Sequence, residues 1–283
     1  MPPGTSRPRL GGLIDAILRR ILNFLRARFY SWRGPAYGLR EAVFWPKLID
    51  YWIRNAEALA FILREAPEGE VVVLDIGSGG GGLAEIIERS RDRHRIRLIV
   101  ADYDKAKVAA VAPKPFMAGR LVTDAANLPL RTGAVDFVSS IDLLEHLPPD
   151  RRSEFLREAR RVARKASIHH CPMDDGEGMF RAEEGDRRFQ DAHVRRFQRR
   201  EAFTDEPLGC AYPDPDEVRS ILPGATIRGD QNAGVWLKYM MFYRRPVAGY
   251  LAGFAYLLRW RRRNGRPPFY SAFITAGGEG KPR

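Results

Sequence analysis

Apolar runs and helical patterns alternate through the middle of the chain. Residues 71–75 (VVVLD) form a short run that ends in an acid, and a glycine cluster follows at 77–82. A helical pattern covers 83–95, and a second apolar run, 96–102 (IRLIVAD), again ends in an acid. This succession predicts a strand, a glycine-rich loop, a helix and a parallel strand. Both acids are then expected at the carboxyl edge of the sheet, where ligands bind in open parallel sheets.

The alternation continues to the C-terminus and is typical of an α/β protein. It predicts further helices over 105–111, 149–165 and 214–222, and further strands over 117–123, 135–140, 166–171, 225–228 and 268–275.

Two helical patterns precede the first strand. Over 13–29 apolar residues recur at helical spacing with arginines mainly off the stripe, and a second pattern covers 40–66. The first helix has two interpretations of equal weight. It lies in a membrane interface with its arginines at anionic headgroups, or it packs on the core and covers a ligand. In the second helix we expect Tyr51, Trp52 and Phe61 to be core residues.

Two long segments are not needed for the sheet. Residues 172–215 are rich in acids, arginines and glycines, and we expect them to form a partly helical lid over a substrate. Residues 232–267 contain two apolar helical pieces, each too short to span a bilayer. We interpret this insert as a membrane or partner surface rather than a packed helical subdomain, because its aromatic and basic residues resemble those of the N-terminal helix.

The predicted organisation follows from these segments. It comprises an N-terminal tail with amphipathic helices (1–69), a core with the lid (70–231), a helical insert (232–267), and a last strand with a tail (268–283).

Charge is unevenly distributed over these parts. The formal net charge is +12, but residues 1–50 carry +6 and residues 238–283 carry +9, which leaves the middle at −3. The two basic ends indicate an anionic surface as partner, not an anionic substrate drawn into the core. Cys171 and Cys210 form neither a disulfide framework nor a metal-finger pattern, which favours a reducing compartment. Without a secretory signal or a long apolar run, we predict a cytoplasmic protein, peripheral at the inner face of the membrane.

Four motifs occur in order within residues 70–170. They are Asp75 with Gly77, Gly79 and Gly81; Asp102 at the end of the next strand, with Asp104 as an alternative; Asp124 in VTDAANLPL; and the strand and turn VDFVSSIDLLEHL at 135–147. Together they resemble the class I S-adenosylmethionine-dependent methyltransferases, of the methyltransferase type 11-like kind. Any one of them alone is a weak signal, and the four in order are specific.

The resemblance implies a Rossmann-like, seven-stranded, mostly parallel sheet with helices on both faces. This chain adds N-terminal helices and a helical insert before the last strand. The implied cofactor is S-adenosyl-L-methionine, with Asp102 on the ribose hydroxyls and Asp124 on the adenine amino group. The alternative for Asp124 is a helix N-cap. The cofactor-binding residues implied by the resemblance are Asp75, Gly77, Ser78, Gly79, Gly81, Asp102, Tyr103, Asp124, Ala125 and Ile141.

The glycine cluster alone also fits an NAD(P)-dependent oxidoreductase. Gly77, Gly79 and Gly82 satisfy G-x-G-x-x-G, and Asp102 lies where an acid would hold a ribose. Asp75, however, would place a carboxylate beside a bound pyrophosphate, which like-charge repulsion opposes. The later motifs also have no role in that reaction, so we favour a methyltransferase.

Methyl transfer to oxygen calls for a general base, and His146 follows the fourth strand at the predicted crevice. Asp142, Glu145 and His146 also resemble the acid-x-x-acid-His cluster of ubiquinone-biosynthesis O-methyltransferases, which holds a divalent metal. Here Asp replaces the first Glu. The spacing places the three residues on one helical face. Because Leu-Glu-His-Leu is common where no metal binds, we predict no metal and regard them as weak candidates. His169, His170 and His193 are further candidates for the base or for contact with the acceptor. An adjacent pair of histidines at a strand end often has one exposed and one buried member.

Three classes of function stay open at this point. The favoured one is methylation of a small or lipid-linked acceptor, such as a quinone, polyprenyl or glycan intermediate, at an anionic membrane surface bound by the basic ends. Methylation of RNA, with the basic ends holding its phosphates, is the weaker alternative, because no catalytic motif such as N-P-P-Y is present. A binding module without catalysis is disfavoured, since it has no need for the intact acids and glycines. The sequence leaves the oligomeric state open.

Overall fold

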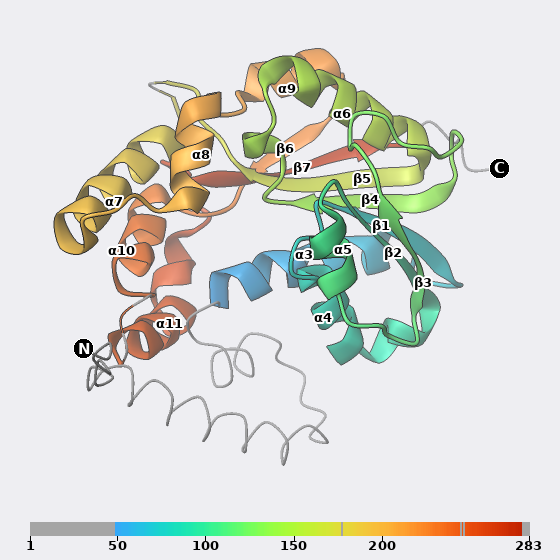
Figure 1. Ribbon diagram of the computed structural model, residues 1–283, viewed down its shortest axis with the longest axis horizontal. Helices are drawn as coiled ribbons and strands as arrows, with labels where there is room; N and C mark the ends of the chain where they lie inside the picture. The colour runs from blue at the N-terminus through green and yellow to red at the C-terminus, as the bar shows by residue number, and fades with distance from the viewer. Residues whose placement is uncertain (1–48, 177, 244, 246, 279–283) are drawn as a thin grey trace, which may run out of the picture.

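A seven-stranded sheet forms the centre of the computed structural model, which describes residues 49–176, 178–243, 245 and 247–278 (Figure 1). The strands are β1 Val71–Ile76, β2 Ile96–Asp102, β3 Met117–Val122, β4 Val135–Ile141, β5 Ala163–Pro172, β6 Thr226–Gly229 and β7 Ser271–Gly277. Their order is β3-β2-β1-β4-β5-β7-β6. Strands β1 to β5 are parallel, and β7 pairs antiparallel with both β5 and β6. The predicted Rossmann-like, mostly parallel sheet is therefore confirmed.

Helices cover both faces of this sheet. They are α3 Ile49–Glu65, α4 Gly82–Arg89, α5 Lys105–Ala110, α6 Pro149–Val162, α7 Ala182–Phe197, α8 Ala202–Cys210, α9 Pro215–Ile221, α10 Ala233–Tyr243 and α11 Ala248–Leu258. Three short 3₁₀ turns are η2 Arg91–Arg95, η3 Leu144–His146 and η4 Trp260–Arg263. The predicted helix at 13–29 and the start of the one at 40–66 lie outside the described residues. None of the described helices has the length and apolar character needed to cross a membrane.

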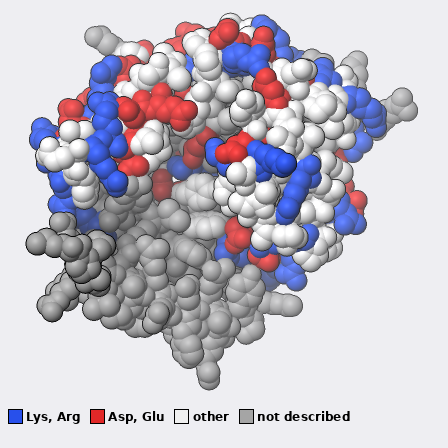
Figure 2. All heavy atoms as spheres, in the orientation of Figure 1, with Lys and Arg blue, Asp and Glu red and all other residues white. Residues whose placement is uncertain are grey.

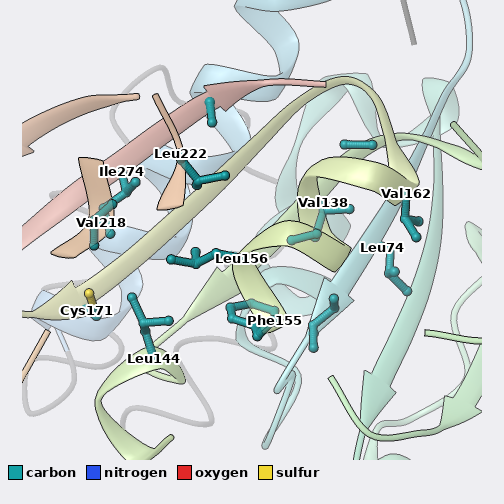
Figure 3. Packing of buried hydrophobic residues seen from close by; sticks show 14 of the residues in the cluster. Leu74, Val138, Leu144, Phe155, Leu156, Val162, Cys171, Val218, Leu222 and Ile274 are labelled. Atoms are coloured by element: carbon teal, nitrogen blue, oxygen red, sulfur yellow. The ribbon is translucent and has the colours of Figure 1, made fainter. Parts of the chain in front are cut away.

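Two apolar layers hold the helices on the sheet. On one face, α6 and α9 contribute Phe155, Leu156 and Val218, which pack on Val138 and Ile274 of the strands (Figure 3). On the other face, residues of α3 and α4 pack on the apolar side chains of β1 and β2. Because these parallel strands are buried on both faces, their sequences are almost continuously apolar.

Three predicted boundaries differ from the structure. The helix expected over 149–165 ends at Val162, and β5 begins at Ala163, where it pairs with Val135 of β4. After the buried Ala163, the next two residues of β5, Arg164 and Lys165, are charged and exposed, so this part of the sequence gives no strand signal. The last strand begins at Ser271 instead of 268, since its pairing with β5 starts there. The helix over 83–95 ends at Arg89, after which the Ser90 hydroxyl caps the separate turn η2.

The remaining helices form a unit beside the sheet. Helices α7, α10 and α11 and the start of α3 share one apolar cluster, which includes Ile49, Phe189, Trp236 and Tyr256. The segment 172–215 is more helical than expected, because α7 and α8 fill most of it. Helix α10 packs into this cluster, which agrees with the less favoured interpretation of the insert as a packed helical subdomain. On α11, Leu251 and Leu258 stay exposed, so the surface interpretation remains a prediction.

Candidate functional site

The glycine loop after β1 turns the backbone tightly above the sheet. Gly77 has a φ of +68°, a conformation that glycine adopts without strain, and a Cβ there would lie 3.1 Å from the Leu143 side chain. At Gly82, the first residue of α4, a Cβ would overlap the Tyr51 hydroxyl. The absence of a side chain at 82 thus lets α3 bring Tyr51 to the loop, a contact that the sequence pattern does not reveal.

A cavity of about 590 Å³ opens between this loop and the carboxyl ends of β1, β2 and β4. Its size is ordinary for a small-molecule site. Of the ten cofactor-binding residues implied by the sequence, nine line the cavity: Asp75, Gly77, Ser78, Gly79, Asp102, Tyr103, Asp124, Ala125 and Ile141. Gly81 is the exception, because it precedes α4 in a left-handed conformation against Val111. Sequence reasoning missed the lining residues Lys107 and Arg151.

Two buried acids lie at the floor of this cavity. Burial raises the pKa of Asp75 to about 7, the Ser139 hydroxyl opposing the shift and the charge of Asp102 adding to it. The Asp102 carboxylate accepts the backbone N–H of Gly79 at 3.2 Å and that of Asp104 at 3.0 Å. These acids suit a ligand with hydroxyl groups and a positive charge, whereas a pyrophosphate would be repelled.

The structure separates the two candidate acids after β2. The Asp104 side chain caps α5 by accepting the N–H of Ala106 at 2.7 Å, and it does not line the cavity. Asp102 is therefore the acid that faces the ligand space.

Asp124 and Tyr103 stand at the mouth of the cavity. Asp124 accepts the N–H of Ala126 at 2.9 Å and pairs with Arg151. A turn follows Asp124 and no helix starts there, so the N-cap alternative is wrong. Tyr103 is 83% exposed, so its ring is accessible to a flat ligand group.

A second cavity, of about 250 Å³, adjoins the first. Tyr51, Asp142 and His146 line both cavities. Its other walls come from the start of α3, η3, the end of β5, helices α8 and α10, and the residue before β7: Asp50, Arg54, Glu145, Pro172, Phe203, Pro207, Trp236, Tyr239, Met240 and Tyr270. Tyr51 packs on the core as expected, and it also lines both cavities. Burial raises the pKa of Tyr51 to about 12, and the negative charges of Asp75 and Asp142 contribute to the increase, so the phenol stays neutral.

The prediction that Asp142, Glu145 and His146 share one helical face is wrong. Asp142 ends β4 with a φ of +56°, and only a single 3₁₀ turn follows. The Asp142 carboxylate pairs with Arg54 at 2.7 Å and with His170 at 3.2 Å, so it points away from an i, i+4 partner. Within the described part of the chain, no cluster of three or more acids, histidines or cysteines has metal-binding geometry.

His146 lies between two carboxyl groups at the junction of the cavities. Its Nδ1 is 3.2 Å from Oε2 of Glu206, a contact without hydrogen-bond alignment, and its Nε2 is 3.9 Å from Oε1 of Glu145. Glu206 belongs to α8, within the segment expected to form a lid. Nothing in the sequence pattern connected Glu206 with His146.

The adjacent histidines on β5 are both buried, contrary to the expectation that one is exposed. Since β5 lies between β4 and β7 and is covered on both faces, neither side reaches solvent. His169 hydrogen-bonds Ser140 at 2.8 Å, and burial lowers its pKa to about 4. Burial would also lower the pKa of His170, but Asp142 and Asp230 outweigh this effect and raise it. His193 is buried in α7 and lines neither cavity.

Comparison with known proteins places this site in a family context. Residues 74–171, which hold the glycine loop, both buried acids and His146, match the methyltransferase domain model Methyltransf_11. No curated protein matches the sequence.

Similar solved structures show low sequence identity. Magnesium protoporphyrin IX methyltransferase (ChlM) of Synechocystis PCC 6803, with bound SAH, is 13% identical over 94% of this chain and 100% of that one, at a TM-score of 0.49. A putative sarcosine dimethylglycine methyltransferase of Galdieria sulphuraria is 14% identical over 90% and 98%, at 0.49. The PH0226 protein of Pyrococcus horikoshii OT3 is 20% identical over 43% of this chain and only 58% of its own length, at 0.36.

The segment matched by the family model contains the central residues of the site. The matched segment supplies the acids and the glycine turn, and the sheet order places them at one edge. The chain thus carries a class I methyltransferase domain, and it is an S-adenosyl-L-methionine-dependent methyltransferase.

Proposed function

We propose that this enzyme methylates a small acceptor held in the second cavity. The observation that carries the proposal is the shared wall of the two cavities, formed by Tyr51, Asp142 and His146. A methyl donor in the first cavity and an acceptor in the second would meet at this wall. Methyl transfer depends mainly on such alignment, because proximity can supply several kcal/mol of the barrier reduction.

Each group of the first cavity has a role in this proposal. Asp102 receives the ribose hydroxyls, Asp75 and the loop at Gly77 hold the methionine part, and Asp124 and Tyr103 hold the adenine. When bound, S-adenosyl-L-methionine supplies a methyl group activated by a positively charged sulfur. The acceptor lone pair forms the new bond to the methyl carbon while the carbon–sulfur bond breaks and its electrons stay on sulfur. His146 takes the proton that the acceptor loses.

The test of this proposal follows a labelled methyl group. Enzyme and methyl-labelled S-adenosyl-L-methionine are incubated with a small-molecule cell extract, and mass spectrometry identifies the labelled product. His146→Asn is expected to lower the rate about 100-fold, as is typical for loss of a general base, with S-adenosylhomocysteine affinity unchanged. His94→Asn, at an exposed position on η2, is the matched control and should leave the rate unchanged. Full activity of His146→Asn would contradict the role of His146, and absence of any labelled product would contradict the function.

We also propose that a lipid-linked acceptor would be reached at an anionic membrane surface through α11 and η4. The support is an apolar edge, with Leu251 and Leu258 being 64% and 61% exposed, next to the exposed Arg259, Arg262 and Arg263. Apolar and cationic groups side by side suit a membrane interface.

RNA is less well supported as a partner. On the face seen in Figure 2, acidic and basic side chains are intermixed over α7 instead of forming a basic track. Two of the arginines there pair with acids one turn away, Arg187 with Glu183 and Arg188 with Glu184.

Flotation with vesicles tests the membrane proposal. The protein is expected to float with vesicles that contain phosphatidylserine and not with purely zwitterionic ones, because each arginine near the surface adds about 1 kcal/mol. Leu251→Asp with Leu258→Asp should abolish flotation. Met179→Asp, at an apolar residue that is also exposed but distant in sequence, should not. Equal flotation of the double variant would exclude α11 as the docking surface.

A further inference from the structure

The second cavity combines aromatic walls with one carboxyl group, that of Glu145, of which one oxygen has no hydrogen-bond partner in the described part of the chain. Glu145 is 3% exposed and faces this cavity, and its Oε2 has no hydrogen-bond partner among the described residues. A buried acceptor left unpaired costs stability, typically 1–3 kcal/mol or more for a charged group. Because Glu145 lines a cavity, a ligand bound there can supply the missing partner.

Charge in the cavity is unbalanced toward the acids. Among the described lining residues, the carboxyl groups of Asp50, Asp142 and Glu145 face a single guanidinium, that of Arg54. Arg54 is already engaged by the first two, through Nη1 to Asp50 at 3.3 Å and Nη2 to Asp142 at 2.7 Å. Among the described residues, Glu145 therefore has no guanidinium partner of its own, and its ion-pair contact is with Nε2 of His146 alone, 3.9 Å from its Oε1. Burial and the charge of Asp142 raise the pKa of Glu145 well above its usual range, and a cationic ligand group would favour its charged form.

The aromatic walls favour the same kind of ligand. Trp236 and Tyr270 stack with centroids 3.7 Å apart and planes at 10°, and both line the cavity. The Tyr270 hydroxyl donates to the buried Asp186 at 3.0 Å, which fixes the orientation of the stack. Ring faces attract cations, and this attraction strengthens in a desolvated site. A neutral hydroxyl gains no comparable energy from these rings.

We infer that the acceptor methylated by this enzyme carries a basic amine, whose ammonium form is bound between Glu145 and the aromatic walls of the second cavity. This inference rests on the proposed function and narrows it to nitrogen methylation. The bound ammonium loses one proton to His146, and the freed nitrogen lone pair then forms the bond to the methyl carbon as the carbon–sulfur bond breaks. The volume, about 250 Å³, exceeds the 150 Å³ cavity that holds benzene in other proteins, so a substituted ring or an amine of similar size fits.

Benzylamine and benzyl alcohol form a matched pair of probes, since they differ mainly in the charge of the polar group. Full-length enzyme is first saturated with S-adenosylhomocysteine, and each probe is then titrated by calorimetry. Benzylamine is expected to bind at least about tenfold more tightly, as loss of one charge-assisted contact predicts. Glu145→Gln should remove this preference while benzyl alcohol binding stays unchanged. Glu184→Gln, at an exposed acid on α7, should keep the preference.

The outcomes separate the two levels of the proposal. Failure to bind S-adenosylhomocysteine would count against the proposed function. Normal binding of S-adenosylhomocysteine with no preference for benzylamine, including binding of neither probe, would overturn the amine inference alone. Preserved preference in Glu145→Gln would overturn the role of Glu145. The Tm of Glu145→Gln is expected to equal or exceed that of the wild type. If Glu145 had a purely structural role, the substitution would lower the Tm.

Discussion

Asp102→Ala is expected to weaken S-adenosylhomocysteine binding by about 1,000-fold. The proposed role gives the Asp102 carboxylate two charge-assisted hydrogen bonds to the ribose, each worth about 1.5–3 kcal/mol. The carboxylate also accepts the Gly79 N–H at 3.2 Å, so its loss loosens the glycine loop that faces the cofactor. Calorimetry measures the affinity, and thermal unfolding checks that the variant is folded.

Asp104→Ala is the control for this variant. Asp104 lies two residues further along and caps α5 without lining the cavity. Its replacement is expected to cost about 1 kcal/mol of stability, the usual value of an N-cap, and to leave the affinity unchanged. The opposite pattern, with Asp104→Ala losing the ligand and Asp102→Ala keeping it, would contradict the assignment of Asp102.

Arg152→Met is expected to lower the free energy of unfolding by about 3–5 kcal/mol, because it removes a buried charge that holds several partners. Arg152 is 1% exposed. It donates to the carbonyls of Leu144 at 3.1 Å and Cys210 at 3.2 Å and to that of Ala211, and it pairs with Glu217 at 3.5 Å. Thermal unfolding should show a fall in Tm of roughly 10 °C.

The same substitution should weaken acceptor binding more than cofactor binding. Leu144 belongs to η3 together with Glu145 and His146, and Cys210 ends α8, so Arg152 ties both walls of the second cavity to α6. Arg157→Met, at an exposed arginine on the same helix, is expected to change stability by less than about 0.5 kcal/mol. A wild-type Tm for Arg152→Met would show that these contacts contribute little.

Much of the lining of the first cavity was predictable from the sequence, for a physical reason. Its chemistry lies in residues that directly follow strands, such as Asp75 and Asp102, and in a loop whose glycines are needed by the backbone itself. Parallel strands bring their carboxyl ends to one edge, so order along the chain determines proximity in space. Only the Gly81 placement differed, because that residue serves the turn into α4 and not the cavity.

The second cavity depends on contacts between segments far apart in the chain. Tyr51 reaches the site because position 82 lacks a side chain, and Arg54 of α3 pairs with Asp142 at the end of β4. Trp236 and Tyr270 come together from α10 and the approach to β7. In the sequence, these residues have the spacing of ordinary core aromatics and surface charges.

By itself, the sequence thus indicated the α/β fold, the methyl donor and most of the predicted residues that line the first cavity, since these follow from local backbone requirements and strand order. Only the tertiary structure decided that a second cavity exists, that Glu145 faces it with one oxygen unpaired among the described residues, and that Asp142, Glu145 and His146 share no helical face. These features arise from packing between α3, η3, α8 and α10, and side-chain periodicity within one segment contains no information about such packing.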